Sequence, residues 1–353
     1  MTNSSCPRST VDERAWAPIL SALLAGRDLT AADTSWVLTE VIGGTASPAR
    51  LAGFLVALRA KGETAEEVAG LVDALQDSGI GLDIAGPVVD LVGTGGDRTG
   101  AVNISTMASL VVAATGVRVV KHGGRGASTA NGSADVLEAL GVDLDLSPRR
   151  VGEVAAEVGI TYCFAPAFHP GLRHAAPVRR ELGIPTVFNV LAPLLNPARP
   201  RHQLVGVAPA PMTTVLAEVL ARRGGVALVA RGDDGLDKFT TTTTTQVWEV
   251  RDGQIAHHVV DPGAFGIPRA RPADLRGEDL AANVRAVRRL LAGEPGPVRD
   301  VVLLNAAAAR TTLAPADGPL PDRLAAELVR CAEAVDSGRA CRLLEDWVAA
   351  TRR

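Results

Sequence analysis

Apolar residues recur at helical spacing through the first 80 residues of the chain. Leu20, Leu23 and Leu24 would share one face of a helix, because residues three and four apart are neighbours on a helical surface. Residues 1–11 are polar, and we expect a disordered N-terminus there. The pattern predicts an all-helical domain over residues 12–80.

Start signals divide this region into several helices. Thr30 with Asp33, and Thr64 with Glu67, are typical of an N-cap followed three residues later by an acid. Pro48 suits the first turn of a further helix, where its missing N–H is not needed. Four short helices are therefore predicted before the chain changes character.

Short apolar runs alternate with helical segments after residue 85. Residues 88–92, 117–120, 160–164 and 226–230 are typical of buried strands, and residues 108–114, 153–158 and 217–223 of helices. This alternation predicts an α/β domain with a mostly parallel sheet over residues 85–353. A helical insert at about residues 171–183 belongs with the N-terminal helices in this interpretation. The tail, residues 321–351, is predicted to be helical, and the threonine run 240–245 to be a strand edge or a loop.

Composition narrows the class of protein. Hydrophobic residues make up 47% and charged residues 21%, which is ordinary for a globular protein. The net charge of −3 disfavours a general nucleic-acid binder. No apolar run approaches 18 residues and the N-terminus has no apolar core, so we expect neither a membrane span nor a secretory signal and place the chain in the cytoplasm. The four cysteines form no CxxC pair, which predicts reduced thiols.

A glycine-rich turn follows the first predicted strand. The segment from Gly93 to Asp97 reads GTGGD, and its glycines would let backbone N–H groups approach an anion closely. A dinucleotide fingerprint would need glycine where Arg98 stands, and the Gly-Lys-Ser/Thr of a P-loop is missing. The turn alone leaves a purely structural role open.

Two further segments strengthen the case for an anion site. Residues 103–106, NIST, precede an apolar helix whose N-terminus would favour negative charge. Residues 121–129, KHGGRGAST, combine a lysine, an arginine, a histidine, three glycines and two hydroxyls directly after a strand. Three such turns at strand ends suit a ligand with two clusters of phosphate, because α/β sheets bind ligands at that edge.

These motifs, in this order and spacing, resemble the anthranilate phosphoribosyltransferase family of tryptophan biosynthesis. The likeness continues through residues 169–199 (HPGLRHAAPVRRELGIPTVFNVLAPLLNPAR), the DDGLD segment and the VLLNAAAA segment near residue 302. It implies a small helical domain joined to an α/β domain, a homodimer, and transfer of phosphoribose from phosphoribosyl pyrophosphate (PRPP) to the amine of anthranilate, with release of pyrophosphate. Neither nucleic acid nor a membrane is implied as a partner.

The resemblance also assigns residues to the donor. It implies PRPP binding by Gly93, Gly96, Asp97, Asn103, Ile104, Ser105, Thr106, Lys121, His122, Gly123, Gly124, Arg125, Ala127, Ser128, Thr129 and Ser133. One or two Mg²⁺ ions are implied as cofactor, with Ser105 and Asp237 as ligands. No general base is assigned, because an aromatic amine is already neutral at pH 7; positioning and electrostatics by Lys121 and Arg179 carry the reaction instead.

For the acceptor, the resemblance implies Gly93, Gly124, His169 and Arg179, with Arg179 gripping the anthranilate carboxylate. On sequence alone, Arg179 beside Arg180 would be read as a solvated or ion-paired residue. His122 and His169 are equally readable as packed core histidines.

The chain departs from the family pattern at four places, one of which is Ala101, where the motif has threonine or serine before NIST. Gly124 stands where the motif has an asparagine that contacts the acceptor, and Ala192 where it has a glycine. Lys238 replaces the glutamate that is a metal ligand in the family, which predicts that the second metal site is weakened or absent. The hypothesis follows that Lys238 contacts pyrophosphate itself; the alternative is that it points to solvent.

Three other functions remain open at this point. The emptier pocket at Gly124 suits a related transferase that uses a different aromatic or amino-carboxylate acceptor in specialised metabolism. A non-catalytic homologue that binds PRPP or a nucleotide is a second alternative. A nucleoside phosphorylase is a third, which the loop motifs disfavour.

Overall fold

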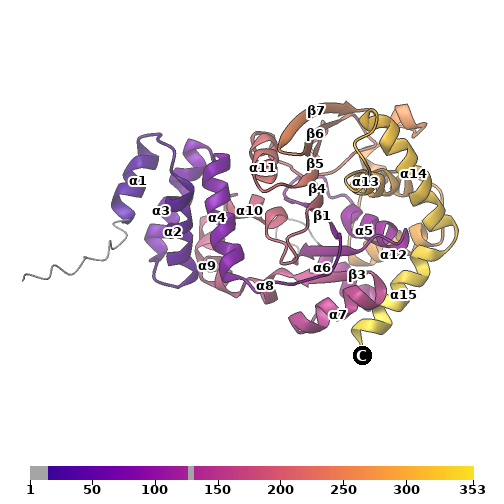
Figure 1. Cartoon of the computed structure of the whole chain (residues 1–353), viewed down its shortest axis with the longest axis horizontal. Coiled ribbons are helices and arrows are strands. Elements are labelled where there is room, and N and C mark those ends of the chain that lie inside the picture. The colour runs from indigo at the N-terminus through magenta and orange to yellow at the C-terminus, as the bar shows by residue number, and fades with distance from the viewer. Residues whose placement is uncertain (1–14, 126–130) are drawn as a thin grey trace, which may run out of the picture.

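Two groups of elements lie side by side in the protein, a helical bundle and a larger unit built on one sheet (Figure 1). The structure is a computed structural model that describes residues 15–125 and 131–353. This arrangement confirms the expected fold class: an N-terminal helical bundle with an α/β unit. Among the described residues, no helix is both long and apolar enough to cross a membrane.

The bundle contains α1 (Trp16–Leu24), α2 (Ala31–Ile42), α3 (Pro48–Lys61) and α4 (Ala65–Ser78). Both predicted capping boxes are confirmed, since Thr30 and Thr64 accept the backbone N–H of Asp33 and Glu67. The expected face of α1 was partly wrong. Leu24 is 80% exposed, and Trp16 and Ile19 are buried with Leu23 instead.

The sheet has seven strands in the order β3-β2-β1-β4-β5-β6-β7. These strands are β1 (Val89–Gly93), β2 (Val119–Gly123), β3 (Ile160–Phe164), β4 (His202–Gly206), β5 (Val226–Gly232), β6 (Thr245–Arg251) and β7 (Gln254–Val260). The first five in spatial order pair in parallel, while β6 and β7 pair antiparallel at one edge. The mostly parallel sheet is therefore confirmed.

Helices cover both faces of the sheet. The regular helices of this unit are α5 (Ile104–Ala114), α6 (Ser133–Leu140), α7 (Pro148–Val158), α11 (Pro211–Arg222), α12 (Leu280–Leu291), α13 (Pro297–Thr311), α14 (Leu320–Asp336) and α15 (Arg339–Thr351). The short ones are α8 (Ala165–Phe168), α10 (Phe188–Leu191) and the 3₁₀ turns η2 (Ala192–Leu194), η3 (Pro262–Phe265) and η4 (Pro272–Leu275). The predicted helical tail is confirmed as α14 and α15, which Ser337 and Gly338 separate.

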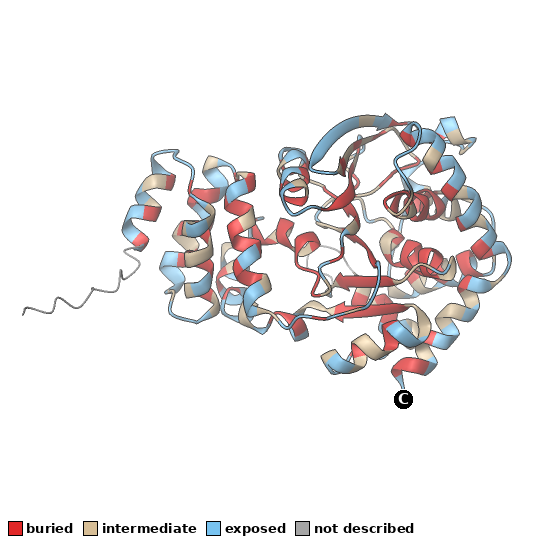
Figure 2. Ribbon diagram, viewed as in Figure 1, coloured by how far each residue is buried: buried red, intermediate tan, exposed pale blue. Residues whose placement is uncertain are grey.

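Strand residues alternate between two apolar clusters. On β1, Leu91 packs into the cluster formed with α5 and α13, whereas Val92 packs into the cluster formed with α11 and the bundle. This alternation follows from the pleat of a strand, which points successive side chains to opposite faces. Figure 2 shows the buried residues running through the strands and the inner sides of the helices. The second cluster is continuous from α1 to α11, so bundle and sheet share one core.

The insert predicted at residues 171–183 folds as η1 (Pro170–His174) and α9 (Ala176–Leu182). These elements contact α2 and α3, so they lie spatially with the N-terminal helices, although they come from the middle of the sheet unit. Arg179 belongs to α9 and therefore comes from the side of the helical bundle.

Glu67 is a buried acid that organises the bundle, and its loss is our first prediction. Its two oxygens accept the N–H groups of Leu29 and Thr64, and one pairs with Lys61 at 3.0 Å. Glu67→Ala leaves the two backbone N–H groups without an acceptor and removes one partner of Lys61, and we expect the free energy of unfolding to fall by about 3 kcal/mol in urea titrations. Glu66→Ala, at the exposed neighbouring position, is expected to cost under about 1 kcal/mol. Equal losses would contradict the role of Glu67.

Candidate functional site

A cleft of about 370 Å³ lies at the carboxyl ends of the parallel strands. Its walls come from the segments that follow β1, β2, β3 and β5, together with η1, α9 and α10. This is the edge at which open α/β sheets bind ligands. The position agrees with the expectation from the three glycine-rich or polar turns.

Most of the predicted site residues meet in this cleft. It is lined by Gly93, Asp97, Asn103, Ser105, Lys121, His122, Gly123, Gly124, Arg125, Ser133, His169, Arg179, Asp237 and Lys238. Three predicted residues do not line the cleft: Gly96 is exposed, and Ile104 and Thr106 belong to the first turn of α5 and are buried. Ala127, Ser128 and Thr129 lie outside the described residues.

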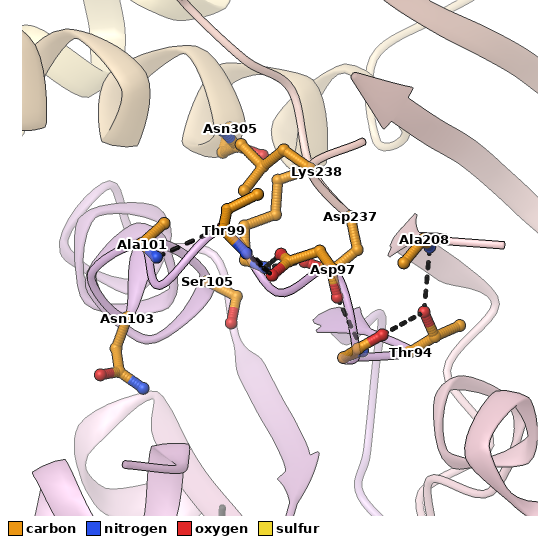
Figure 3. A network of polar contacts seen from close by, with 12 residues as sticks. Thr94, Asp97, Thr99, Ala101, Asn103, Ser105, Ala208, Asp237, Lys238 and Asn305 are labelled. Carbon is orange, nitrogen blue, oxygen red and sulfur yellow. Dashed lines mark hydrogen bonds and ion pairs between the residues drawn. The ribbon is translucent and has the colours of Figure 1, made fainter. Parts of the chain in front are cut away.

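The loop after β1 is tied to the loop after β5. Asp237 accepts the backbone N–H of Gly95 through Oδ2 at 2.7 Å (Figure 3). Asp237 packs against the last residues of β1 and β4, and both of these must be glycine. A Cβ at Gly93 would lie 2.1 Å from Asp237 Oδ2, and one at Gly206 would lie 1.5 Å from the carbonyl oxygen of Asp237. The glycine-rich turn therefore has a structural partner as well as a place at the cleft.

Lys121 is a buried cation at the floor of the cleft. Its side chain donates to the carbonyl of Leu91 at 2.6 Å and to Ser105 Oγ at 3.3 Å, and the residue is 2% exposed. Burial lowers the pKa of Lys121 to about 8, although the charge of Asp90 on the next strand opposes that shift. An ammonium with so little water around it interacts strongly with any anion that enters the cleft.

Asp90 is the buried counter-charge to Lys121. It accepts Asn196 Nδ2 at 2.8 Å and the backbone N–H of His122 at 3.4 Å. Burial raises the pKa of Asp90 to about 6, with Lys121 and these hydrogen bonds acting in the other direction. Sequence analysis missed this residue, yet an acid inside the apolar run VVDLV was a visible signal.

The start of α5 borders the same floor. Asn103 precedes the helix and donates to the carbonyl of Asn131 at 3.3 Å, and Ser105 presents its hydroxyl to Lys121. The first N–H groups of a helix carry a partial positive charge, so this end of α5 adds to the attraction of an anion. Asn131 also lines the cleft, and sequence analysis missed it.

His122 and His169 face each other edge to face, with ring centroids 5.4 Å apart. His122 Nδ1 contacts the carbonyl of Ala192 at 3.1 Å, and His169 Nε2 contacts that of Leu195 at 2.8 Å. Burial, with smaller contributions from His169 and Lys121, lowers the pKa of His122 to about 3. Both rings line the cleft and both are buried, so each histidine is a packed residue and also part of the cleft wall.

Arg125 differs most from its expected surroundings. It forms ion pairs with Asp135 at 3.1 Å and Glu138 at 2.5 Å and is stacked over the ring of Phe164. The two acids therefore already neutralise the arginine expected to meet a phosphate. Gly124 leaves open space, because a Cβ built there meets nothing within 4 Å. Ser133 at the start of α6 shares a 2.7 Å hydrogen bond with Tyr162.

Arg179 is a half-buried cation for which the described residues provide no counter-charge. Its guanidinium lies 5.1 Å from the ring centre of Phe188, and within residues 15–125 and 131–353 no carboxylate forms an ion pair with it. Burial lowers the pKa of Arg179, although an arginine stays protonated at neutral pH. A cation in this state suits an anionic group of a ligand. Among the described residues Arg179 is therefore not ion-paired and is only partly exposed, and its role toward an acceptor stays a prediction.

Lys238 points into the cleft rather than to solvent. Its ammonium contacts the carboxylate of Asp237 and lies 3.7 Å from Asp97 Oδ2, and its side chain is 17% exposed (Figure 3). Burial lowers the pKa of Lys238, but the two carboxylates outweigh that effect and raise it overall. The same ammonium helps to lower the pKa of Asp97.

The side chains here do not fit a magnesium ion held by the protein alone. Asp237 gives Oδ2 to the N–H of Gly95 and Oδ1 to Lys238, and Ser105 Oγ lies against Lys121. Across the described residues, no three His, Cys, Asp or Glu side chains gather so that they could hold a metal ion. The assignment of Ser105 and Asp237 as ligands stays a prediction.

Comparison with known proteins finds two family models and several relatives that match this chain. The family model described as "Glycosyl transferase family, a/b domain" matches residues 85–341, and "Glycosyl transferase family, helical bundle domain" matches residues 17–79. The chain is 56% identical over 340 residues to the anthranilate phosphoribosyltransferase of Salinispora arenicola (strain CNS-205), covering 95% of this chain and 96% of that protein.

Two solved structures are similar over nearly the full chain. The anthranilate phosphoribosyltransferase of Thermus thermophilus is 40% identical, with a TM-score of 0.87 and coverage of 95% and 99% of the two chains. The Saccharomyces cerevisiae enzyme in complex with PRPP and Mg is 25% identical, with a TM-score of 0.85 and coverage of 96% and 98%.

The buried neutral state of His122 generates a prediction about pH. An unfolded histidine takes up a proton near pH 6.5, whereas the folded one does so only near pH 3, so the unfolded chain binds more protons below about pH 6.5. The free energy of unfolding should therefore fall by about 1 kcal/mol between about pH 6.5 and about pH 5.5 from this group. Urea titrations of His122→Gln should show a shallower decline than the unchanged protein.

His169 remains in the His122→Gln variant, and burial lowers its pKa as well. The free energy of unfolding of that variant should therefore still fall somewhat as the pH is lowered. His257→Gln removes an exposed histidine and serves as the matched control. A His122→Gln decline parallel to that of His257→Gln would contradict a neutral buried His122.

Proposed function

Because the chain belongs to the anthranilate phosphoribosyltransferase family, we propose that it transfers 5-phosphoribose from PRPP to the amine of anthranilate. The amine nitrogen forms a bond to C1 of the ribose while the bond from C1 to the pyrophosphate oxygen breaks. Pyrophosphate leaves with the bonding electrons, and the positively charged nitrogen then loses one of its two protons to water, which leaves a neutral secondary amine. The products are N-(5-phosphoribosyl)anthranilate and pyrophosphate, so the chain is a pentosyltransferase.

One observation carries this proposal most directly. A single cleft holds cations from two parts of the fold, the buried Lys121 from β2 and the half-buried Arg179 from α9. The phosphate groups of the donor and the carboxylate of the acceptor are each best bound by a cation, and the cleft offers one cation for each. The PRPP and Mg complex of the Saccharomyces cerevisiae enzyme, and its complex with 4-fluoroanthranilate, support the same two substrates.

The donor is proposed to lie over the floor of the cleft. Lys121 and the start of α5 attract the pyrophosphate, which gains negative charge as the bond to C1 lengthens. Asp97 is one of two carboxylates that line this floor, with Asp237, and would balance the positive charge that develops on the ribose. The remaining donor residues implied by the resemblance, including those from Ala127 to Thr129, stay predictions.

The acceptor is proposed to lie toward α9. Arg179 would bind its carboxylate, with Phe188 fixing the guanidinium in place. His169, Gly93 and Gly124 line the same cleft and would surround the ring. Since an aromatic amine is neutral at pH 7, these residues have only to hold it against C1, and positioning supplies much of the rate enhancement.

Magnesium is proposed to arrive on the donor. Mg²⁺ prefers phosphate and carboxylate oxygens and keeps several of its waters, so PRPP can bring it as a complex. The domain boundaries at residues 12–80 and 85–353, the homodimer and the cytoplasmic location also stay proposals, which rest on the sequence and on the resemblance.

A related acceptor is the second candidate, because one observation favours it. The space beside Gly124 is open, so a bulkier aromatic or amino-carboxylate acceptor would fit where anthranilate fits. The deciding experiment is turnover with PRPP, Mg²⁺ and anthranilate, followed by loss of anthranilate fluorescence and release of pyrophosphate. Turnover near 1 s⁻¹ or faster, usual for enzymes, supports anthranilate. Donor binding without turnover would move the proposal to another acceptor.

Arg179→Ala provides a test of the acceptor site. We expect the KM for anthranilate to rise by about tenfold to a hundredfold, the range for losing a charged hydrogen bond, while the KM for PRPP changes little. Steady-state kinetics with each substrate varied in turn measures both. Arg180→Ala removes the exposed neighbouring charge and should leave both values near those of the unchanged enzyme. Equal rises for the two substrates would exclude the assigned role.

A further inference from the structure

Lys238 is the cation closest to the two carboxylates at the floor of the cleft. It contacts Asp237, whose side chain is 1% exposed, and lies 3.7 Å from Asp97 Oδ2, whose side chain is 7% exposed. An ammonium carries three N–H donors. Contacts to two carboxylates leave at least one donor for a ligand, and Lys238 lines the cleft.

The backbone beside Lys238 is held firmly. Asn305 on α13 accepts the N–H of Phe239 at 3.1 Å and donates to the carbonyl of Phe239 at 2.8 Å and to that of Val301 at 2.8 Å. Asn305 is 1% exposed, and Figure 3 shows it next to the start of the Lys238 side chain. A charge on a fixed backbone keeps its place without a ligand, as a preorganised electrostatic site requires.

An ammonium of the protein already lies against both carboxylates at this floor. Asp97 and Asp237 carry two negative charges, and Lys238 contacts Asp237 and lies 3.7 Å from Asp97, whereas Lys121 is paired with Asp90. Two carboxylates without an ammonium would repel pyrophosphate and would need a divalent cation between them. The geometry instead places a protein cation at that point, where both Asp237 oxygens already accept N–H groups.

We propose that Lys238 is a built-in cation that binds the pyrophosphate group of the donor directly, in place of a metal ion held by the protein. The inference rests on the proposed function, since it assumes a donor that carries pyrophosphate. Its consequence is that the chain binds pyrophosphate even when no divalent cation is present. Lys238 would thus bind the donor directly, and Asn305 would position Lys238 by holding the backbone of Phe239 beside it.

Calorimetric titration with pyrophosphate tests the proposal without turnover. The unchanged protein should bind with Kd values that differ by less than about tenfold between Mg²⁺ and EDTA buffers. Lys238→Met keeps the apolar stem and removes the charge, and it should weaken binding in EDTA by about tenfold to a hundredfold. Lys238→Arg keeps the charge and should weaken it less. Arg149→Gln removes an exposed charge on α7 and should change nothing.

A second reading of the contacts treats Lys238 as a counter-ion that only stops the carboxylates from repelling the ligand. A double-mutant cycle separates the two roles. If Lys238 only neutralises, adding Asp97→Asn to Lys238→Met should restore pyrophosphate binding in EDTA. If Lys238 donates to pyrophosphate, the double variant should stay weak relative to Asp97→Asn alone. Restoration would overturn the proposal.

Spectroscopic counting of Mn²⁺ gives an independent readout. Without pyrophosphate, the unchanged protein should bind no Mn²⁺ in electron paramagnetic resonance titrations, because an ammonium occupies the place between the carboxylates. Lys238→Glu supplies a third carboxylate and should gain one Mn²⁺ per chain. Binding of Mn²⁺ by the unchanged protein would overturn the proposal.

Failure of the inference and failure of the proposed function give different results. If the protein binds pyrophosphate and PRPP in Mg²⁺ buffer but binds neither in EDTA, the proposed function stands and the proposal of a built-in cation is wrong. A protein that binds neither ligand in Mg²⁺ loses the proposed function itself. Tight binding in both buffers, weakened by Lys238→Met, supports both.

Discussion

The burial of Lys121 in the middle of a parallel sheet constrains everything around it. An ammonium without water needs a nearby carboxylate and hydrogen-bond acceptors, and Asp90, the carbonyl of Leu91 and Ser105 supply them. Asp90 in turn requires Asn196, which also donates to the carbonyl of Val120 at 2.7 Å. One buried charge thus fixes β1, β2 and the segment after η2 with respect to one another.

The cleft combines elements that are far apart along the chain. Its floor comes from the sheet, while Arg179 comes from α9, which packs with the N-terminal helices. The shared apolar core between the bundle and α11 holds these parts together. The site is therefore placed at the junction of the two units, where cations from both face one space.

Much of this was predictable from the sequence. Capping residues such as Thr30 and Thr64 act locally, so the helices of the bundle followed from short patterns. Four of the parallel strands, β1, β2, β3 and β5, were visible as apolar runs, and the glycine-rich turns after β1 and β2 marked the cleft. The strand at residues 160–164 was predicted with its observed bounds.

Features that depend on distant partners were not predictable in the same way. β4, β6 and β7 were missed, and β7 is mostly exposed, so it has little of the apolar character of a core strand. The threonine run forms a loop that ends as β6 begins at Thr245. The pairing of Arg125 with Asp135 and Glu138 arises from the fold of α6, and spacing alone does not show it.

The hydrogen bond from Gly95 to Asp237 has a consequence for how the protein acquires its binding ability. It joins residues 142 positions apart, and closing such a loop costs entropy that only later contacts repay. During synthesis, the floor of the cleft is incomplete until β5 and the segment after it have left the ribosome. The cleft floor thus forms only after Asp237 has been made, and a molecule bound in the cleft would stabilise both halves of the sheet unit at once.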